Sequence, residues 1–122
     1  LLIVDGDTSS RCGISMKGID IVVKGSVGHM SAFMAQSGNL VVCGNAGEAL
    51  GDSLYETDIY VRGKVKSLGA DCVEKKMDNK HTKKLDKLLK RANIKNLKAT
   101  DFKRYGSSRK LYNFNIDNVS NY

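Results

Sequence analysis

Residues 25–63, GSVGHMSAFMAQSGNLVVCGNAGEALGDSLYETDIYVRG, contain the pattern that decides the fold. Glycines recur in this stretch at a constant interval of 19 residues, at Gly25, Gly44 and Gly63, and Gly6 continues the series towards the N-terminus. A second row of small residues keeps the same interval half a period later, at Gly13, Ala32, Gly51 and Ala70. A period close to 20 residues is typical of a solenoid, in which each repeat forms one coil.

The residues before these glycines predict parallel strands stacked one above another. One column holds Leu2, Ile21, Leu40 and Ile59, and a column two positions later holds Val4, Val23, Val42 and Val61. Because alternate residues of a strand face the same side, both columns point into one interior. Strands about 4.8 Å apart would align these side chains into ladders. The sequence therefore predicts an all-β fold, a parallel, right-handed β-helix with 19-residue coils over residues 1–75.

A third column lies between the two interior ones and should face outward. It is also apolar, at Ile3, Val22, Val41 and Tyr60. A strand that is hydrophobic on both faces implies cover on both faces. The cover is either a helix of this chain or another subunit. We therefore treat this column as a candidate partner surface, together with four residues near the C-terminus: Arg104, Tyr105, Arg109 and Tyr112.

The glycines are predicted to be structural. Gly28 and Gly47 give GSVG and GNAG in the two central coils, but a phosphate-binding loop requires GxGxxG or GK[ST] followed by a helix, and neither pattern is present. Corner glycines, which adopt backbone conformations that other residues adopt reluctantly, explain a recurrence in register more simply. We assign this role to Gly6, Gly25, Gly44, Gly63, Gly28 and Gly47, and we count Gly13 and Gly51 of the second row as structural glycines as well.

Two charged pairs are separated by one repeat and are expected to be vertical neighbours. His29 and Glu48 form one pair, and Asp52 and Asp71 form the other. The first pair could perform acid–base chemistry, but no nucleophile shares its column and a surface ion pair is the simpler interpretation. The two carboxylates of the second pair can be accommodated by solvent or by a basic partner. We predict no catalytic residue on this chain.

The cysteines do not predict a metal site. Cys12, Cys43 and Cys72 are far apart in the sequence, without a CxxC pair and without a histidine at finger spacing. An odd number of cysteines in a chain without a secretory leader suggests reduced thiols, which behave as small buried apolar residues. No window approaches the apolar length of a transmembrane helix, so we expect a cytoplasmic protein without membrane contact.

Residues 76–122 should add a helix and an extended tail to the same structural domain. Residues 78–92 place Leu85, Leu88 and Leu89 on one stripe, with Asp78 or Asn79 as N-cap and Asn93 as stop. We expect this helix to cap the last coil, because solenoids need their ends covered, and we expect His81 to face solvent.

Charge is divided unevenly along the chain. Residues 1–74 carry 6 Lys/Arg and 9 Asp/Glu, a net charge of −3, whereas residues 75–122 carry 14 and 4, a net charge of +10. A basic segment can bind phosphate backbones, but no nucleic-acid-binding motif accompanies it, so we do not expect nucleic acid as a partner. The opening LLIVDG already forms a strand in phase with the repeat. We therefore expect coils before residue 1, or self-association through an exposed strand edge.

Three stretches carry a resemblance to a known family. They are GSVGHMSAFMAQSGNLVVCGNAGEALGDSLYE, VRGKVKSLGADC and FKRYGSSRKLYNFNIDN. Together they resemble the GXGXG domain, the β-helix at the C-terminus of the glutamate synthase large subunit. The chain is most similar to its stand-alone form, the third domain of split glutamate synthases and the B subunit of N-methylglutamate synthase. The resemblance covers essentially the whole chain.

This resemblance implies a non-catalytic scaffold subunit in the formation of glutamate or N-methylglutamate. Its partners would be a glutamine amidotransferase, which releases ammonia, and an FMN-dependent synthase, and the FMN and iron–sulfur cofactors would belong to those subunits. The family supplies no catalytic residue, cofactor ligand or metal ligand for this chain. Two alternatives remain open: the similar C-type subunit of formylmethanofuran dehydrogenase, and a free-standing interaction module.

Overall fold

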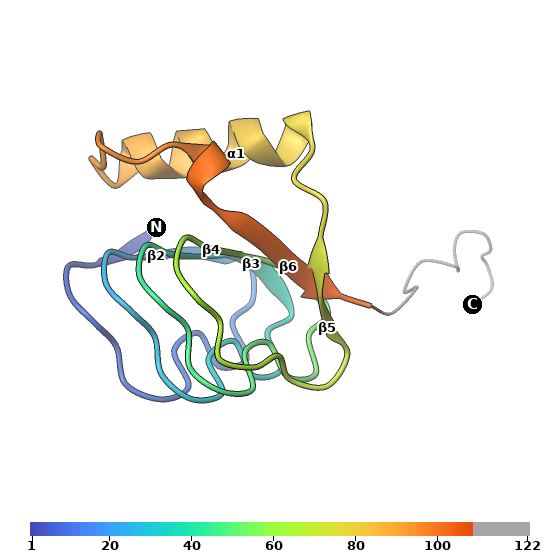
Figure 1. Cartoon of the computed structure of the whole chain (residues 1–122). Helices are drawn as coiled ribbons and strands as arrows, with labels where there is room; N and C mark the ends of the chain where they lie inside the picture. The colour runs from blue at the N-terminus through green and yellow to red at the C-terminus, as the bar shows by residue number, and fades with distance from the viewer. Residues whose placement is uncertain (109–122) are drawn as a thin grey trace.

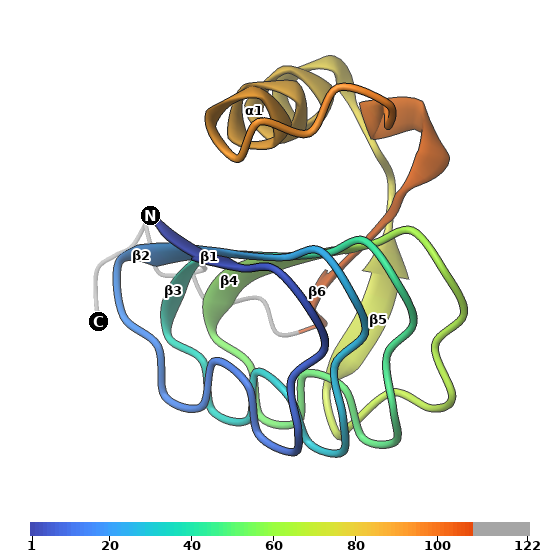
Figure 2. The ribbon, with the colours of Figure 1, turned by 90° about the vertical axis from the view of Figure 1, so that its left-hand side faces the viewer.

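A computed structural model describes residues 1–108. It consists of a solenoid of stacked coils and a helix that lies across one side of it (Figure 1; Figure 2). The elements in chain order are β1 (Leu2–Val4), β2 (Ile19–Val23), β3 (Ser37–Val42), β4 (Glu56–Val61), β5 (Cys72–Lys75), α1 (Asn79–Arg91), the 3-10 helix η1 (Ala99–Asp101) and β6 (Lys103–Ser107). The strands form a single sheet in the order β1-β2-β3-β4-β6-β5.

The first four strands are parallel and stack in the predicted register. Ile21 pairs with Leu2 of β1 and with Leu40 of β3, and Leu40 pairs with Ile59 of β4, so each step is one full repeat. Outside the strands, the same step recurs in the parallel bridges that join Val27, Ala46 and Val65. The predicted all-β parallel β-helix is therefore confirmed.

Aliphatic side chains fill the interior of the solenoid. Leu40, Val42 and Ile59 from the predicted columns are fully buried, and Leu50 and Leu54 from the loops close the opposite wall of the same cluster. Tyr105 of β6 packs against this cluster from the end of the last coil. The interior is thus a packed core that side chains of successive coils fill in ladders.

The structural glycines act in two different ways, and the corner conformation lies at other glycines than predicted. Gly13 and Gly51, in the second row, have positive φ angles of 73° and 70°. The six glycines for which a corner conformation was predicted do not have positive φ, so that prediction was wrong. A Cβ atom at Gly25, Gly44 or Gly63 would lie 2.8 to 2.9 Å from the carbonyl carbon of the glycine one coil earlier. They are needed because successive backbones approach closely.

Gly28 and Gly47 also lie where coils touch, whereas Gly6 lies in the open. A Cβ atom at Gly28 would lie 2.9 Å from the carbonyl carbon of Ser9, and one at Gly47 would lie 2.9 Å from that of Gly28. A Cβ atom at Gly6 would meet nothing within 4 Å. The glycine column is therefore a contact between backbones, and Gly6 is the member without a coil beneath it in this structure.

Residues other than glycine supply most of the left-handed turns. Three positions in each of the first three coils have positive φ, as Arg11, Gly13 and Ser15 show in the first coil. The same positions one and two coils later are Met30, Ala32 and Met34, and Ala49, Gly51 and Ser53. Because these positions recur once per repeat, the loops of the three coils follow the same backbone path. Glycine occupies only the middle position, in the first and third coils, and alanine takes its place in the second.

The fourth coil leaves this register. Leu50 pairs with Leu68, one position short of a full repeat. The N–H of Ser53 donates to the carbonyl of Ala70 at 3.0 Å, whereas the corresponding bonds of the earlier coils, from Ser15 to Phe33 and from Met34 to Asp52, span one residue more. The predicted stacking of Asp71 on Asp52 and of Ala70 on Gly51 therefore fails. With fewer residues in its last loop, the chain leaves the stack and enters β5, which pairs antiparallel with β6.

Helix α1 covers the outward face of the sheet and not the end of the last coil, where we had predicted it. The helix lies over the outer side of the sheet (Figure 2), and its Leu85, Leu88 and Leu89 pack against residues of β2, β3 and β4. The predicted N-cap is correct, because the Asp78 carboxylate accepts the backbone N–H of His81 at 2.9 Å. The end of the stack is covered by β6, which pairs antiparallel with the free edge of β4.

Candidate functional site

The outer face of the sheet, predicted as a partner surface, is occupied by the chain itself. Val22, Val41 and Tyr60 are completely buried in a second core that α1 and Phe102 complete. Of the predicted column only Ile3 is exposed, at 39%. Of the two covers predicted for this column, the chain's own helix is the one present, and the partner surface predicted at these three buried positions was wrong.

A polar column lies beside this second core, and the sequence analysis missed it. Asp20, Asn39 and Asp58 occupy neighbouring strands at the same register position, two positions before Val22, Val41 and Tyr60. The amide Nδ2 of Asn39 donates to Oδ1 of Asp20 at 2.8 Å. The sequence did contain a signal for this column, because the three residues are spaced by one repeat.

Asp58 is the centre of the most densely charged cluster in the described part of the chain. Its carboxylate lies 3.1 Å from Nζ of Lys84 on α1, 2.9 Å from Nη1 of Arg104 on β6, and 3.5 Å from Nε2 of His81 on α1. The other ring nitrogen of His81, Nδ1, lies 2.6 Å from the carboxylate of Asp78. His81 was expected to face solvent, but its side chain is only 15% exposed between these two carboxylates.

This cluster holds three elements together. Asp58 lies on β4, and its partners come from α1 and β6. Arg104 also donates from Nε to the carbonyl of Lys76 at 3.0 Å, which fixes the segment between β5 and α1. Because most of these side chains are largely buried and satisfy one another, the arrangement is suited to anchoring the three elements.

The four predicted partner residues near the C-terminus lie in different places. Arg104 belongs to the Asp58 cluster, and Tyr105 is buried in the solenoid core at 6% exposure, so the prediction that these two contact a partner was wrong. The reason is that β6 folds back onto the sheet and buries both side chains. Arg109 and Tyr112 lie outside the described residues.

Burial favours the neutral forms of Tyr60, Cys43 and Cys72. Burial, and to a lesser extent the charge of Asp58, raises the pKa of Tyr60 well above its ordinary range. Burial raises the pKa of Cys43, against which Arg62 and Lys24 act, and it raises the pKa of Cys72 to about 11. Since the thiolate is the nucleophilic form, neither thiol is activated at neutral pH. Cys12 is partly exposed.

The two charged pairs singled out from the sequence do not form. Glu48 lies 3.7 Å from Nζ of Lys66, and among residues 1–108 the structure records no hydrogen bond or ion pair between Glu48 and the exposed His29. Asp52 accepts a hydrogen bond from the hydroxyl of Ser53 at 2.8 Å, and the shorter last loop displaces Asp71 from it. Within the described range no group of three His, Cys, Asp or Glu side chains could hold a metal ion.

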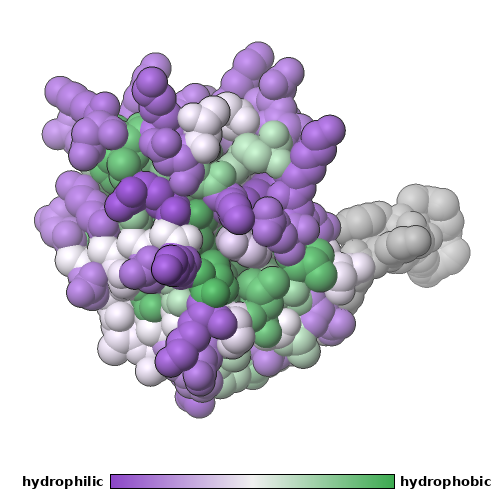
Figure 3. Space-filling view, viewed as in Figure 1, coloured by the Kyte–Doolittle hydropathy of each residue, from purple (hydrophilic) through white to green (hydrophobic). Residues whose placement is uncertain are grey.

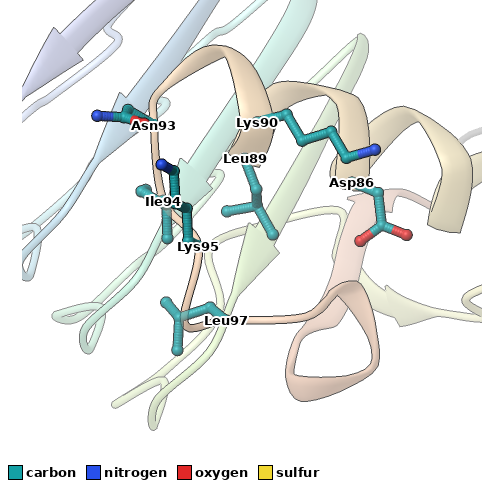
Figure 4. Close-up of a pocket in the computed structure, with 7 residues that line it drawn as sticks. All are labelled: Asp86, Leu89, Lys90, Asn93, Ile94, Lys95 and Leu97. Atoms are coloured by element: carbon teal, nitrogen blue, oxygen red, sulfur yellow. The ribbon is translucent and has the colours of Figure 1, made fainter.

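Shallow hollows surround α1 and the loop that follows it. One, of about 300 Å³, lies at the C-terminal end of α1, with Leu89, Ile94 and Leu97 between charged residues that include Asp86 and Lys90 (Figure 4). The side of the molecule that carries α1 presents mainly hydrophilic side chains (Figure 3). Helical segments within residues 1–108 lack the combination of length and apolar character that spanning a bilayer requires.

The chain has a curated relative. It is 66% identical over 96 residues to Protein GlxC of Rhizobium meliloti (strain 1021). The match covers 79% of this chain and 42% of Protein GlxC, so the chain spans less than half the length of that relative. No family model and no solved structure matches the chain. The comparison thus relates the chain to one part of a longer protein.

Proposed function

We propose that the chain is a structural subunit of a glutamate synthase-type complex. Its stacked coils would hold a glutamine amidotransferase chain and an FMN-dependent synthase chain in fixed relative positions, in the formation of glutamate or N-methylglutamate. The FMN and iron–sulfur cofactors would belong to those partners, and the assembly would work in the cytoplasm. The chain itself would supply no catalytic group.

One observation carries this proposal: successive coils contact one another through both backbone and side chains. Gly44 donates to the carbonyl of Gly25 at 2.8 Å, Gly63 donates to that of Gly44 at 2.8 Å, and Val42 is completely buried between them and the opposite wall. A continuous ladder of this kind forms a rigid body whose surface positions are fixed relative to one another. Rigidity of this kind is what a spacer between two enzymes requires.

The resemblance to the GXGXG domain adds the identity of the partners to this physical argument. It implies a parallel β-helix, and the sequence analysis added a basic C-terminal segment folded as part of the same unit. The solenoid supports the first part, and the packing of α1 on β2, β3 and β4 supports the second. The choice of amino acceptor would be made on the synthase chain, away from the residues described here.

Co-purification tests the proposal. The tagged chain, expressed in its native cell, should bring down both an amidotransferase and a flavin-containing synthase in fixed stoichiometry. Leu88→Asp, which places a charge under α1, serves as a control that should lose the fold and both partners together. If the folded chain recovers neither kind of subunit, the proposal is wrong. Recovery of formylmethanofuran dehydrogenase subunits would establish the alternative complex instead.

A further inference from the structure

Arg62 lines two neighbouring hollows. The first, of about 230 Å³, lies between the outer ends of β2 to β4 and the segment that follows α1, and Lys24, Arg62 and Asn96 contribute its polar lining. The second, of about 480 Å³, lies between the fourth coil and the start of β6, and Arg62, Lys64 and Lys103 contribute to its lining. We call the two hollows together the Arg62 groove.

The Arg62 groove is cationic. Its lining contains Lys24, Arg62, Lys64 and Lys103, against one carboxylate, that of Asp101. Two other hollows are more balanced: the one in Figure 4 has two lysines and one aspartate, and one beside β4 has two cations and two carboxylates. In a concave site, like charges reinforce one another and attract a counter-ion more strongly than they would on a flat surface.

The few acidic groups near the groove are already engaged. Oδ2 of Asp101 accepts the backbone N–H of Lys98 at 2.9 Å, as part of the cap of η1. Asp5 lies 3.1 Å from Nζ of Lys24, but the Asp5 side chain is 88% exposed, and such surface pairs are weak. Lys24 can therefore exchange this partner for a ligand that enters the groove.

Arg62 is held in an orientation suited to binding an oxyanion. Its Nε donates to the carbonyl of Cys43 at 2.8 Å, which fixes the plane of the guanidinium group while leaving both terminal nitrogens without a recorded partner among residues 1–108. A guanidinium fixed in this way binds carboxylate or phosphate oxygens through two parallel N–H donors. Lys24, Arg62 and Cys43 all line the first hollow, so its two positive charges lie near this thiol and oppose the rise in its pKa.

We propose that the Arg62 groove binds a small anion with at least two negative charges, either a phosphorylated compound or a polycarboxylate. Arg62 binds one oxyanion group through its terminal nitrogens, and Lys24 or Lys64 binds the second from either side. Hollows of a few hundred Å³ are of the size that holds small molecules, which favours a compact ligand over an extended polymer. The proposal concerns the isolated chain and does not depend on the proposed function.

Calorimetric titration of the full chain at about 50 mM salt tests the groove, with pyrophosphate and citrate as the two probes. The double variant Arg62→Gln/Lys64→Gln should weaken binding at least tenfold. The matched control Lys90→Gln/Lys95→Gln removes the same charge from the hollow of Figure 4 and should bind like the unmodified chain. Tighter binding of pyrophosphate assigns the site to phosphorylated compounds, and tighter binding of citrate assigns it to polycarboxylates.

Three results would overturn the proposal. The first is that neither probe binds. The second is that the groove variant and the control variant lose affinity equally, which indicates general attraction to a basic chain. The third is that only a single-stranded DNA oligonucleotide binds, which indicates a nucleic-acid surface. Circular dichroism of each variant verifies its fold. If Arg62→Gln disturbs the fold through loss of its bond to Cys43, the single variant Lys64→Glu, at an exposed position, provides the same test by charge reversal.

Discussion

Replacing Gly44 by alanine tests whether the glycine column is a contact between coils. A Cβ atom at this position would lie 2.8 Å from the carbonyl carbon and oxygen of Gly25 and 2.5 Å from Oγ of Ser26. The carbonyl carbon cannot move away freely, because its own oxygen accepts the N–H of Gly44 at 2.8 Å. Relief of the clash must therefore separate two coils in the middle of the stack.

The expected cost follows from three contributions. Overpacking costs about 1–3 kcal/mol, and weakening one backbone hydrogen bond costs about 1 kcal/mol. The smaller conformational freedom of alanine in the unfolded chain stabilises the folded state by about 0.5–1 kcal/mol and offsets part of this cost. We expect Gly44→Ala to lower the free energy of unfolding by about 2 kcal/mol. With a urea dependence of about 1–3 kcal/mol per molar, the midpoint followed by circular dichroism should fall by about 1 M.

Gly6→Ala is the matched control within the same column. Since a Cβ atom at Gly6 would meet nothing within 4 Å, this variant should change the unfolding free energy by no more than about 0.5 kcal/mol. Gly18→Ala measures a different term, because Gly18 has a φ of 68° and open space around it, and should cost about 1 kcal/mol. Equal midpoints for Gly44→Ala and Gly6→Ala would refute the argument from close approach.

Three further predictions concern the layer formed by α1. Leu88→Ala should lower the unfolding free energy by about 2–5 kcal/mol in the same urea assay, because Leu88 is 4% exposed in the second core; a loss below about 1 kcal/mol would show that the helix is not packed as described. Asp58→Asn removes the charge that Lys84 and Arg104 contact and should cost about 1–3 kcal/mol, with faster hydrogen exchange in α1 as a second measurement. The pKa of Asp78 is lowered first by the hydrogen bond from the backbone N–H of His81 and then by the hydrogen bond to the His81 ring. Asp78→Ala should therefore destabilise the chain at neutral pH, and the loss should become smaller as the pH falls below about 4, where Asp78 takes up a proton. An equal loss at about pH 3 and at neutral pH would contradict this assignment.

The repeat determined the solenoid, and that part of the structure could be predicted. One apolar column, from Leu2 to Ile59, fixes the strand direction, the register and the inward face at the same time, because each depends only on residues that are one repeat apart. The fourth coil departed because its loop is shorter, so Leu50 meets Leu68 and not the residue one full repeat later. Shorter loops break a period locally, and the glycine spacing up to Gly63 gives no warning of it.

The segment that covers the outer face of the sheet could not be predicted from the repeat, because its contacts join residues that are not one repeat apart. The apolar column through Val22, Val41 and Tyr60 correctly required a covering layer, but the repeat carries no information on which segment supplies it. The deciding contacts join Asp58 to Lys84 and Arg104, across 26 and 46 residues. The polar column that ends in Asp58 was visible in the sequence, yet its meaning becomes clear only once α1 and β6 are placed.

This packing changes how the basic segment must be studied. Residues 75–108 contain 12 Lys/Arg and 3 Asp/Glu, and the sequence alone presents them as a segment that could be removed. In the structure the same segment contains α1 and β6, which bury Val22, Val41 and Tyr60 and cover the edge of β4. Its removal would expose that face, so lost binding after truncation could reflect unfolding as easily as lost charge. Charge substitutions at exposed positions of the segment, such as Lys90 and Lys95, can separate its electrostatic role from its structural one.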